Sequence, residues 1–529
     1  MTMLTYQSPV ADSRDRFGQT VRAEWTKLRT MRGWLIGLLL AAVLPAGFAF
    51  LGRSSCASQT SGPNGRTVTT ACPGPAIGPN GEAVNDTLFF VHQPLTGSGS
   101  LTVRLTSLTG LYPRAGYGTT TGTAGWSPGL QPWAKVGIII KENTAQGSAY
   151  AAIMLTGSHG VHFQYNFIHD VTGASSSAKA PVWLRLTRSG DTITGYSSAD
   201  GAQWTEVGSG TLTGLGSTAQ IGMFAASPGY VKQTSSRNFF GAPSQATGVF
   251  DRVSLSGGTA ASWNGTEIGG GNGDAAVDTG IAGWTQSGGT FTVQGNGDIA
   301  PDVGQASPGG GGPGGSIDLT LVGDFVGLIA LIVIAAMFMT SEYRRGLIRV
   351  TFAASPDRGR VLAAKAIVIA AVTFVAALIG TILALAVGVH MLHAGGVPIL
   401  PIPKLTLVRI VVGTAAVFAV ASVLTLALAA LLRRTAVVVV LGIVVFVLGW
   451  LLTRGGLLPV SVADWILRLT PAAAYAVQQS IPAYSFVAGE YTPANGFYPL
   501  APWAGVLVLC LWAAAALGLA IYAMNRRDA

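Results

Sequence analysis

Charged residues are scarce in this chain of 529 residues: Asp, Glu, Lys and Arg make up 10% of it, whereas hydrophobic residues make up 49%. Soluble domains carry roughly 25% charged residues, so a single water-soluble body is excluded. Three cysteines are too few for a disulfide-built scaffold. The sequence also contains no Gly-Lys dipeptide, and therefore no P-loop for ATP. These absences indicate a membrane protein without a nucleotide-binding motif of this type.

Apolar runs long enough to cross a bilayer occur six times. A transmembrane helix needs about 20 predominantly apolar residues to cross roughly 30 Å of hydrocarbon. One run precedes residue 52, five follow residue 317, and none lies between them. The predicted spans are residues 34–51, 319–339, 361–389, 409–432, 436–453 and 501–523. We therefore expect a multi-pass α-helical membrane protein with six spans, both termini on one side, and a long segment between the first two spans.

Basic residues are concentrated on one face of this topology. Residues 1–33, 340–365, 433–434 and 524–529 hold half of the 32 basic residues but only 6 of the 23 acidic ones. Short cytoplasmic loops collect Lys and Arg. Both termini are therefore expected in the cytoplasm, and residues 53–316 outside the plasma membrane. The formal net charge of +9 then reflects topology, and no nucleic-acid partner is expected.

The first span has an alternative interpretation as a cleaved signal peptide. Its apolar core exceeds the about 7 to 15 residues that are usual for such peptides. Pro45 also interrupts it. An uncleaved anchor is favoured, and the cleaved form stays open.

Between the first two spans the composition shifts to Gly, Ser and Thr, with short alternating apolar runs. Alternation with a period of two places one set of side chains on the buried face of a sheet. Residues 135–141 (KVGIIIK) are expected as a central strand, and residues 160–168 (GVHFQYNFI) as a strand with its odd-numbered side chains inward. Further strands are expected at residues 100–106, 181–188, 192–197 and 219–225. Many short strands separated by turns favour an extracytoplasmic all-β sandwich or jelly roll.

This segment also resembles a known β-sandwich family. The stretches WAKVGIIIKENTAQGSAYAAIMLTGSHGVHFQYNF, PVWLRLTRSGDTITGYSSADGAQWTEVGSGTL and STAQIGMFAASPG are similar to the concanavalin-A-like (laminin-G-like) jelly-roll modules of bacterial carbohydrate-active enzymes, over residues 86–255. Residues 262–299 resemble the segment that opens such modules, yet here they follow it. We expect a circularly permuted jelly roll, since chain ends often lie close together. A strand at 287–295 outside the sandwich would overturn this hypothesis.

Residues suited to chemistry are few in the β segment. A glycoside hydrolase needs two carboxylates that face one groove, and the predicted strands contain no Glu-x-Asp or Asp-x-Glu pair. His159, His162 and His169 lack a fourth ligand at metal-binding spacing, and alternation predicts that His162 faces solvent. No catalytic residue, metal or cofactor is therefore expected. The aromatic candidates for stacking on sugar rings, or for core packing, are Trp126, Trp133 and Trp204.

Two cysteines fall in the predicted outer segment. Cys56 and Cys72 can form a disulfide in an oxidising compartment, or stay free thiols. The expected order of domains is a cytoplasmic N-terminus with an interfacial helix (1–33), the first span (34–52), the β-sandwich (53–306), a Gly/Pro linker (307–316) and spans two to six (317–529).

The predicted cytoplasmic loop 340–365 (TSEYRRGLIRVTFAASPDRGRVLAAK) is the most informative stretch. Residues 339–354 favour a short helix, which Pro356 ends. Such a helix lies on the membrane surface or docks on a cytoplasmic partner. The alternative is a basic cytoplasmic loop with no further role. Glu342 is expected to pair with Arg345 or with that partner. On the outer side, residues 462–479 are expected to form a surface helix, and the resemblance of the membrane part given next implies the alternative of a helix that dips into the membrane.

A second resemblance concerns the membrane part. The segment Glu24-Trp25-Thr26-Lys27-Leu28-Arg29, the loop 340–365 and the six-span layout are similar to permease subunits of type 2 ABC exporters, especially actinobacterial ones, over residues 20–52 and 317–529. In that family the loop between spans two and three forms a coupling helix on a separate ATPase, and the segment before span one forms an interfacial elbow helix. The resemblance assigns the coupling role to Glu342, Tyr343, Arg344, Arg345, Gly346 and Arg349, and the elbow role to Trp25, Lys27, Leu28 and Arg29.

The resemblance implies the permease of an ATP-driven exporter, which works as a homodimer or heterodimer with a separate ABC ATPase chain and contacts membrane lipid. An ion-coupled carrier is disfavoured, because Asp324, Arg409 and Lys365 lie near the ends of the predicted spans rather than at mid-membrane depth. The alternative is a membrane-anchored adhesion or carbohydrate-sensing protein whose β-sandwich binds cell-wall or other glycan. The sequence does not identify the cargo.

Overall fold

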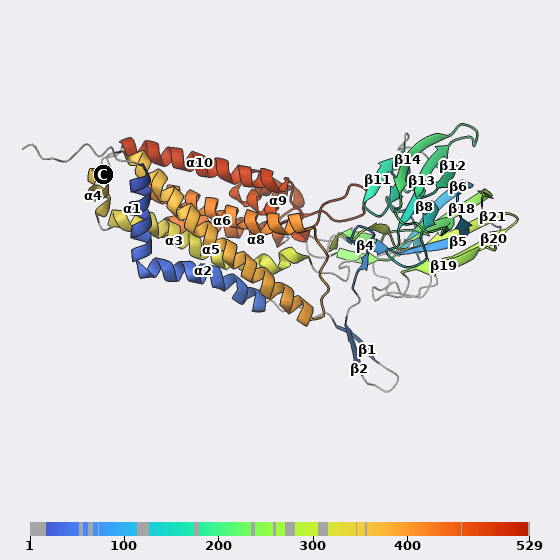
Figure 1. The fold of residues 1–529 in the computed structure, drawn as a ribbon, viewed down its shortest axis with the longest axis horizontal. Coiled ribbons are helices and arrows are strands. Elements are labelled where there is room, and N and C mark those ends of the chain that lie inside the picture. Colours follow the sequence, from blue (N-terminus) through green and yellow to red (C-terminus); the bar gives the residue numbers. More distant parts are fainter. Residues whose placement is uncertain are drawn as a thin grey trace, which may run out of the picture.

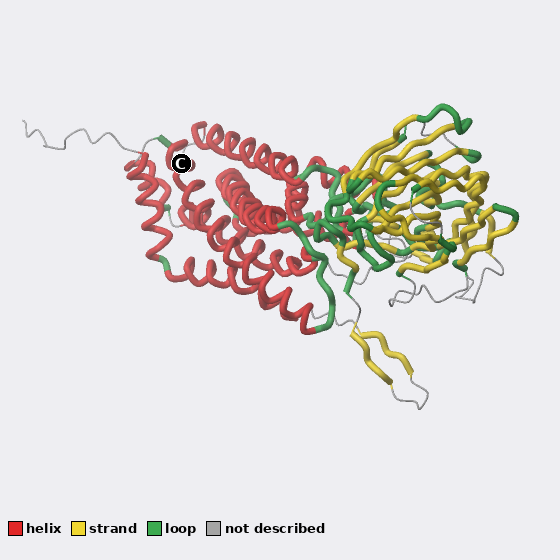
Figure 2. Tube along the Cα trace, turned by 45° about the vertical axis from the view of Figure 1, so that its right-hand side comes forward, coloured by secondary structure: helices red, strands yellow, loops and turns green. Residues whose placement is uncertain are grey.

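Helices and strands occupy opposite ends of this elongated molecule (Figure 1). The computed structural model describes residues 17–51, 57–61, 67–71, 74–113, 126–173, 179–233, 239–257, 261–269, 281–304, 316–344, 346–354, 357–455 and 457–526. The turned view in Figure 2 also separates a helical body from the stranded one. We call the end of the helical bundle that faces the strands the sheet end, and the opposite end the free end.

The long helices follow the predicted apolar runs. They are α2 (Arg32–Leu51), α3 (Asp324–Arg344), α5 (Arg358–Ala394), α6 (Lys404–Leu432), α7 (Thr435–Ile443) with its continuations η3 (Val444–Leu448) and α8 (Gly449–Arg454), and α10 (Pro502–Arg526). In the described part of the chain, six helical stretches are long and apolar enough to cross a membrane. The six predicted spans are therefore confirmed as helices of suitable length and composition.

The first span packs closely against the rest of the bundle. A Cβ atom on Gly323, which ends the short helix η2 (Ile317–Gly323), would lie 2.4 Å from the carbonyl oxygen of Pro45. A Cβ atom on Gly327 would lie 2.8 Å from that of Ala41. Small residues let helix backbones approach each other in this way. The close fit of α2 agrees with the predicted anchor, although cleavage itself stays untested.

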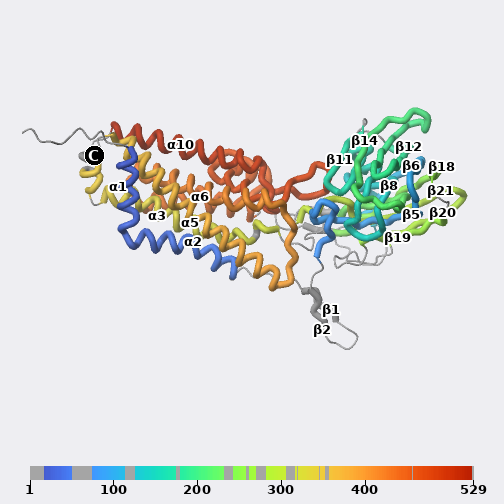
Figure 3. Tube along the Cα trace, in the orientation of Figure 1, coloured from blue at the N-terminus to red at the C-terminus, as the bar shows by residue number. Residues whose placement is uncertain are grey.

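The loop between the second and third spans is shorter than predicted. Helix α3 continues to Arg344, and α5 begins at Arg358, so the separate helix of the loop is α4 (Leu347–Ala354). Gly346 has a φ of +68°, a conformation that favours glycine, and it lets the chain turn between α3 and α4. Helix α1 (Phe17–Thr30), α4 and the last turn of α10 all lie at the free end (Figure 3).

We call residues 76–304 the β region, and two large antiparallel sheets make up most of it. The first has the order β11-β10-β9-β8-β15-β5-β19, and the second the order β14-β13-β12-β6-β18-β21-β20, with β7 beside β6. The first contains β5 (Leu88–Thr96), β8 (Lys135–Lys141), β9 (Tyr150–Thr156), β10 (Val161–Tyr165), β11 (His169–Thr172), β15 (Thr218–Ala226) and β19 (Asn264–Ile268). The second contains β6 (Gly99–Pro113), β7 (Trp126–Pro128), β12 (Val182–Ser189), β13 (Thr192–Ser198), β14 (Thr205–Thr211), β18 (Gln245–Ser256), β20 (Gly283–Ser287) and β21 (Thr290–Gly295).

Smaller pairings complete the strands. They are β1 (Ala57–Ser61) with β2 (Thr67–Ala71), β16 (Tyr230–Gln233) with β17 (Phe239–Ala242), and β22 (Ile299–Pro301) with β4 (Ala83–Asp86), which also pairs with β3 (Ala76–Ile77).

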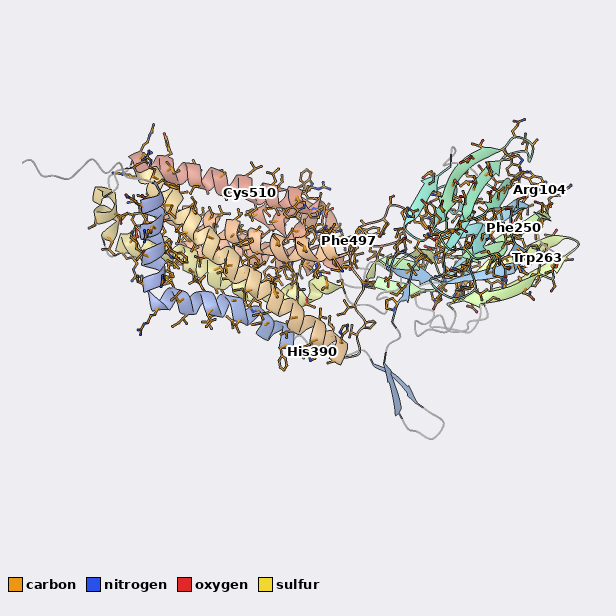
Figure 4. All side chains as sticks on the ribbon, viewed as in Figure 1. Arg104, Phe250, Trp263, His390, Phe497 and Cys510 are labelled. Carbon is orange, nitrogen blue, oxygen red and sulfur yellow. The ribbon has the colours of Figure 1, made fainter. Side chains whose placement is uncertain are left out.

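The two large sheets share one apolar core. Val103 of β6, Ile138 of β8 and Phe250 of β18 belong to the same cluster of buried side chains; Phe250 is labelled among the strands in Figure 4. Strand β8 lies at the middle of its sheet with all seven residues buried, which confirms the predicted central strand. The predicted strands at 100–106, 181–188, 192–197 and 219–225 are confirmed as β6, β12, β13 and β15.

The prediction for residues 160–168 is wrong in its second half. Strand β10 ends at Tyr165, and a turn follows in which Asn166 and Phe167 have φ values of 45° and 63°. This turn carries Phe167 to the opposite face of the sheet, where its ring packs against that of Tyr150 with centroids 4.8 Å apart. His162 is also buried rather than solvent-facing, and its Nδ1 lies 3.0 Å from the carboxylate of Asp170.

A third layer covers the outer face of the first sheet. Val84 of β4 and Ile299 of β22 pack there against Phe90 of β5 in a second buried cluster. The first sheet is therefore buried on both faces, which explains why residues 136–140 of β8 are consecutively apolar rather than alternating. Strand β21 lies inside the second sheet, so the condition that would overturn the circular permutation is not met. The permutation itself stays a prediction.

The chain turns back into the bundle at the sheet end. After α9 (Val460–Leu469), every residue of η4 (Pro471–Gln478) is buried. The indole Nε1 of Trp512 in α10 donates to the carbonyl of Leu469 over 2.9 Å, which holds this return. Both alternatives for residues 462–479 stay predictions. Beyond η4 and the short helix η5 (Pro493–Asn495), Phe497 packs with Val303 of the β region, at the junction marked by the Phe497 label in Figure 4.

Candidate functional site

Four charged side chains from three helices meet at the free end. Lys365 of α5 places its Nζ 2.6 Å from Glu24 Oε2 of α1 and 2.6 Å from Glu342 Oε1 of α3. Lys27 of α1 places its Nζ 2.7 Å from Glu24 Oε1 and 3.1 Å from Glu342 Oε1. We call these four residues the charge cluster. Its two ammonium groups and two carboxylates balance, and they join helices that are distant in the sequence.

Burial makes this pairing obligatory. Lys365 has no exposed surface, and its Nζ lies 4.9 Å from the centroid of the Phe338 ring. Moving an ion out of water costs several kcal/mol, and that cost is offset only where the charge is paired and hydrogen-bonded. Burial lowers the pKa of Lys27, but the hydrogen bonds and charges of Glu24 and Glu342 outweigh it, so the pKa lies above its usual value. The charge cluster thus fixes the relative positions of α1, α3 and α5.

Helix α1 presents one face to the bundle and another to its surroundings. Glu24 and Leu28, which are four residues apart, are buried, whereas Trp25 and Arg29 are exposed. Residues four apart lie on the same side of a helix. The exposed indole and guanidinium suit the boundary between lipid and water, where aromatic and basic side chains are common.

Helix α4 carries an unpartnered apolar face beside the charge cluster. Leu347 is 47% exposed and Val350 66% exposed, and both lie on one side of the helix, whereas Ile348 is buried. A cavity of about 540 Å³ lies between α4, α1 and α3, and Lys27 and Val350 both line it. Lys27 Nζ also lies 3.5 Å from Thr351 Oγ1, so α4 borders the charge cluster directly.

A family comparison fits this arrangement of helices. The sequence matches the family described as ABC-2 family transporter protein over residues 205–529, which is more than half of the chain. The chain belongs to the ABC-2 transporter family. Together with its apolar helices, this makes it a multi-pass membrane component of an ABC transporter, and membership implies partnership with an ABC ATPase subunit.

Other comparisons of this ABC-2 family chain are less informative. No curated protein matches it. Among solved structures, it resembles a functionally unknown protein from Saccharomyces cerevisiae at 12% identity, over 39% of this chain and 97% of that one, with a TM-score of 0.21. Scytalido-glutamic peptidase with a transition state analog inhibitor gives 11% identity, 39% and 98% coverage and a TM-score of 0.23. The GH43 protein BlXynB from Bacillus licheniformis gives 20% identity, 24% coverage of both chains and a TM-score of 0.17. These scores are too low to support a fold or a function.

The predicted coupling residues of the ABC-2 chain have different surroundings. Glu342 is buried in the charge cluster, and its described partners are Lys27 and Lys365, neither of which was predicted. The ring of Tyr343 lies 4.9 Å from the guanidinium carbon of Arg433, which follows α6. Arg344 and Gly346 are exposed, Arg349 lies in α4, and Arg345 lies outside the described residues. Their coupling role stays a prediction.

Sequence reasoning also missed two members of the charge cluster. Of the predicted elbow residues, Leu28 and Lys27 face the bundle, and Trp25 and Arg29 face away from it. Glu24 belonged to the quoted elbow segment without an assigned role, and Lys365 was noted only as lying near a span end. The available signals were the Glu24-x-x-Lys27 spacing, which suits a helical ion pair, and a lysine at the edge of an apolar run.

The β region places its aromatic candidates against other side chains. One face of Trp133 stacks on His159 with ring centroids 3.8 Å apart, and the guanidinium carbon of Arg185 lies 3.8 Å from the ring centroid of Trp204. Trp126 lies in β7. Across the described residues, no group of three or more His, Cys, Asp or Glu could hold a metal ion. Cys56, Cys72 and nearly all of the predicted linker 307–316 lie outside the described residues.

Proposed function

We propose that this chain is the permease subunit of an ATP-driven exporter and that it works as a homodimer or heterodimer with a separate ATPase. The observation that carries this proposal is the ABC-2 family match, which extends over five of the six candidate spans and the loop between α3 and α5. The charge distribution supports an orientation with both termini in the cytoplasm and residues 53–316 outside the cell. The cargo is not assigned here.

Helix α4 is the proposed contact for the ATPase. Its exposed Leu347 and Val350 form a small apolar surface at the free end, where the excess of basic residues predicts the cytoplasm. A displacement of α4 would act on α1 through the contact between Thr351 and Lys27, and on α3 and α5 through the charge cluster. Discrete networks of this kind can pass a local shift to several helices. Helix α1 is the proposed elbow at the lipid boundary.

The β region is the proposed extracytoplasmic insert, a concanavalin-A-like jelly roll between the first and second spans. Its two packed sheets and the position of β21 support this assignment. Its placement at the sheet end, against the segment that contains Phe497, suits a domain that caps the outer opening of the bundle. Glycan binding remains the proposed alternative use of its surface, and Trp126 is its first candidate for stacking on a sugar.

Copurification with the ATPase tests the permease proposal. The full chain is produced together with a candidate ABC ATPase, and the ATPase rate is measured in proteoliposomes. In the double variant Leu347→Ser and Val350→Ser, we expect the amount of copurifying ATPase to fall about tenfold. The reason is that apolar contacts at the centre of interfaces carry most of their binding energy. The matched control is Leu457→Ser between α8 and α9, since Leu457 is 52% exposed and distant from α4 in the sequence. Unchanged copurification of the double variant would reject α4 as the contact.

A further inference from the structure

A cavity of about 690 Å³ lies at the sheet end, between the β region and the beginnings of α6 and α10. Most of its wall is apolar or aromatic, and the contributing side chains include Leu400, Ile402, Ile481, Tyr484, Tyr498 and Pro502. The rest of the wall is polar and comes from Asn80, Glu82, Asp302, Thr406, Arg409, Gln479 and Ser480. Cavities of several hundred Å³ that combine an apolar wall with placed polar groups are typical of sites for small molecules. The cavity is separate from the charge cluster, which lies at the opposite end of the bundle.

One basic side chain in this wall has no acidic partner. Arg409, in the second turn of α6, lines the cavity, and its Nη2 donates to the carbonyl oxygen of Gln479. Its Nε is buried and has no hydrogen-bond partner, and no acidic residue in the described part of the chain forms an ion pair with it. By contrast, the neighbouring Arg454 is paired with Asp318 over 2.6 Å. A half-buried guanidinium with spare donors is suited to an anionic group with two oxygens.

Two acidic residues also line the cavity, and neither neutralises Arg409. Burial raises the pKa of Glu82, whose carboxyl group lies on the β side of the cavity. Asp302 uses its Oδ1 to accept the backbone N–H of Gly304 over 2.8 Å, within its own turn. Both residues belong to the β region, whereas Arg409 lies on the membrane side of the cavity. The charge that an incoming ligand meets from the bundle side is therefore positive.

The cavity borders the lipid-facing surface of the bundle. Leu405 and Val408 on α6 and Trp503 on α10 are exposed. Each is the direct chain neighbour of a residue that lines the cavity. Apolar side chains at this level contact acyl chains, while tryptophan is common at the headgroup level. Basic pockets between transmembrane helices bind anionic lipid headgroups. We infer that this cavity binds an anionic phospholipid of the adjacent leaflet, with Arg409 holding the phosphate and the apolar wall holding the upper part of the acyl chains.

Lipid retention by the intact protein tests this site. The full chain is reconstituted in nanodiscs of equal parts phosphatidylglycerol and phosphatidylcholine, extracted in dodecyl maltoside, and examined by native mass spectrometry. We expect preferential retention of phosphatidylglycerol, a reduction of roughly tenfold in Arg409→Gln, and a smaller reduction in Arg409→Lys, which keeps the charge but loses the two-pronged geometry. Arg468→Gln is the matched control, because Arg468 is an exposed arginine on α9 at the same end.

A second variant keeps the test valid if Arg409→Gln does not fold. Ala501→Trp leaves the guanidinium in place but fills part of the cavity, so it too should lose the retained phosphatidylglycerol. Equal retention of the two lipids by the natural protein, or unchanged retention in both variants, would overturn the inference. Arg409-dependent binding of decyl phosphate without retention of phosphatidylglycerol would show that the cavity takes a free amphiphile and that the lipid assignment is wrong. No ATPase is present in this assay, so its outcome is independent of the proposed contact at α4.

Discussion

Lys141 in the β region and Lys365 in the helical bundle have no exposed surface, yet they are held differently. Lys141 places its Nζ 2.8 Å from one carboxylate, that of Asp86, which also accepts the backbone N–H of Gly147. Lys365 has two carboxylates at 2.6 Å, those of Glu24 and Glu342. The Lys141–Asp86 pair connects β8 of the first sheet to β4 of the layer that covers it. The contacts of Lys365 connect α1, α3 and α5 beside the loop that contains α4.

The difference lies in what each lysine connects. Asp86 and Lys141 are 55 residues apart and both belong to the β region, so their pair stabilises one wall of that region. Glu24 and Lys365 are 341 residues apart, and their pair closes the free end beside α4. Both sites carry the same desolvation cost, because an unpaired charge in an apolar interior is strongly destabilising. A charge network next to a proposed contact for a partner can also transmit motion, whereas a pair inside a rigid wall only supports it.

The largest effect is expected for Lys365→Met. Removal of the central ammonium leaves Glu24 and Glu342 with only Lys27 to balance them, and should destabilise the protein by about 3–5 kcal/mol. The apparent melting temperature of the purified chain in detergent measures this loss. Lys404→Met at the exposed start of α6 is the control. If the two variants melted alike, the charge cluster would not be a stabilising element.

A somewhat smaller effect is expected for Asp86→Asn. The substitution leaves the buried Lys141 without its carboxylate, but the amide oxygen can still accept the N–H of Gly147, so we expect a loss of about 2–4 kcal/mol. Thermal unfolding followed by circular dichroism in the β-sheet range measures it. If Asp86→Asn lost as much stability as Lys365→Met, the second carboxylate beside Lys365 would contribute nothing to the stability of the protein.

The pH response of the β region should be smaller still. Burial lowers the pKa of His92 below its usual 6.5, although a hydrogen bond with Gln220 acts in the opposite direction. The unfolded chain therefore binds the proton more readily, and stability should fall as the pH drops from about 6.5 toward the pKa of the folded state. Melting temperatures at pH 7.5 and 5.5 test this, with His92→Gln as the comparison. If the melting temperature of His92→Gln fell as much between pH 7.5 and 5.5 as that of the natural chain, His92 would be excluded as the cause.

The smallest effect is expected at a partly exposed pair, which keeps more contact with water than the two buried lysines. Arg104 and Asp251 form an ion pair across β6 and β18, and hydrogen bonds from Arg104 lower the pKa of Asp251. This contribution is present above the carboxyl pKa of the unfolded chain and is lost as the pH falls through the pKa of the folded state. Asp251→Asn should change the melting temperature at pH 7 by no more than about 1 °C, since exposed pairs contribute little. A change as large as that of Asp86→Asn would contradict the link between burial and cost.

Much of the fold could be predicted from local patterns. The six spans required only the length of each apolar run, and β6, β8, β12, β13 and β15 followed from short apolar runs between turns. The prediction of residues 160–168 failed where alternation stopped, because the turn at Asn166 and Phe167 has no Gly or Pro to mark it. The prediction for His162 failed because alternation assumes that one face of the sheet is exposed to solvent. His162 is buried and pairs with Asp170.

The candidate sites were less accessible to sequence reasoning. Glu342 stood in the most informative loop, but its partners lie on two other helices, α1 at 315 residues' distance and α5 at 23. Arg409 was noted only as lying near a span end. Its lack of an acidic partner and its place in a cavity emerge only when α6, α10 and the β region are assembled.

Residue order alone determined where the six apolar helices and several of the strands form, because hydrophobic periodicity is set by neighbouring residues and the solvent that each face meets. It also determined that the chain crosses a membrane and that basic residues gather on one side. The tertiary structure decided which charged side chains form ion pairs, which lack an oppositely charged partner, and which apolar faces remain exposed. Those outcomes depend on distances between segments as much as 341 residues apart, and only the packing of the helices and sheets fixes such distances.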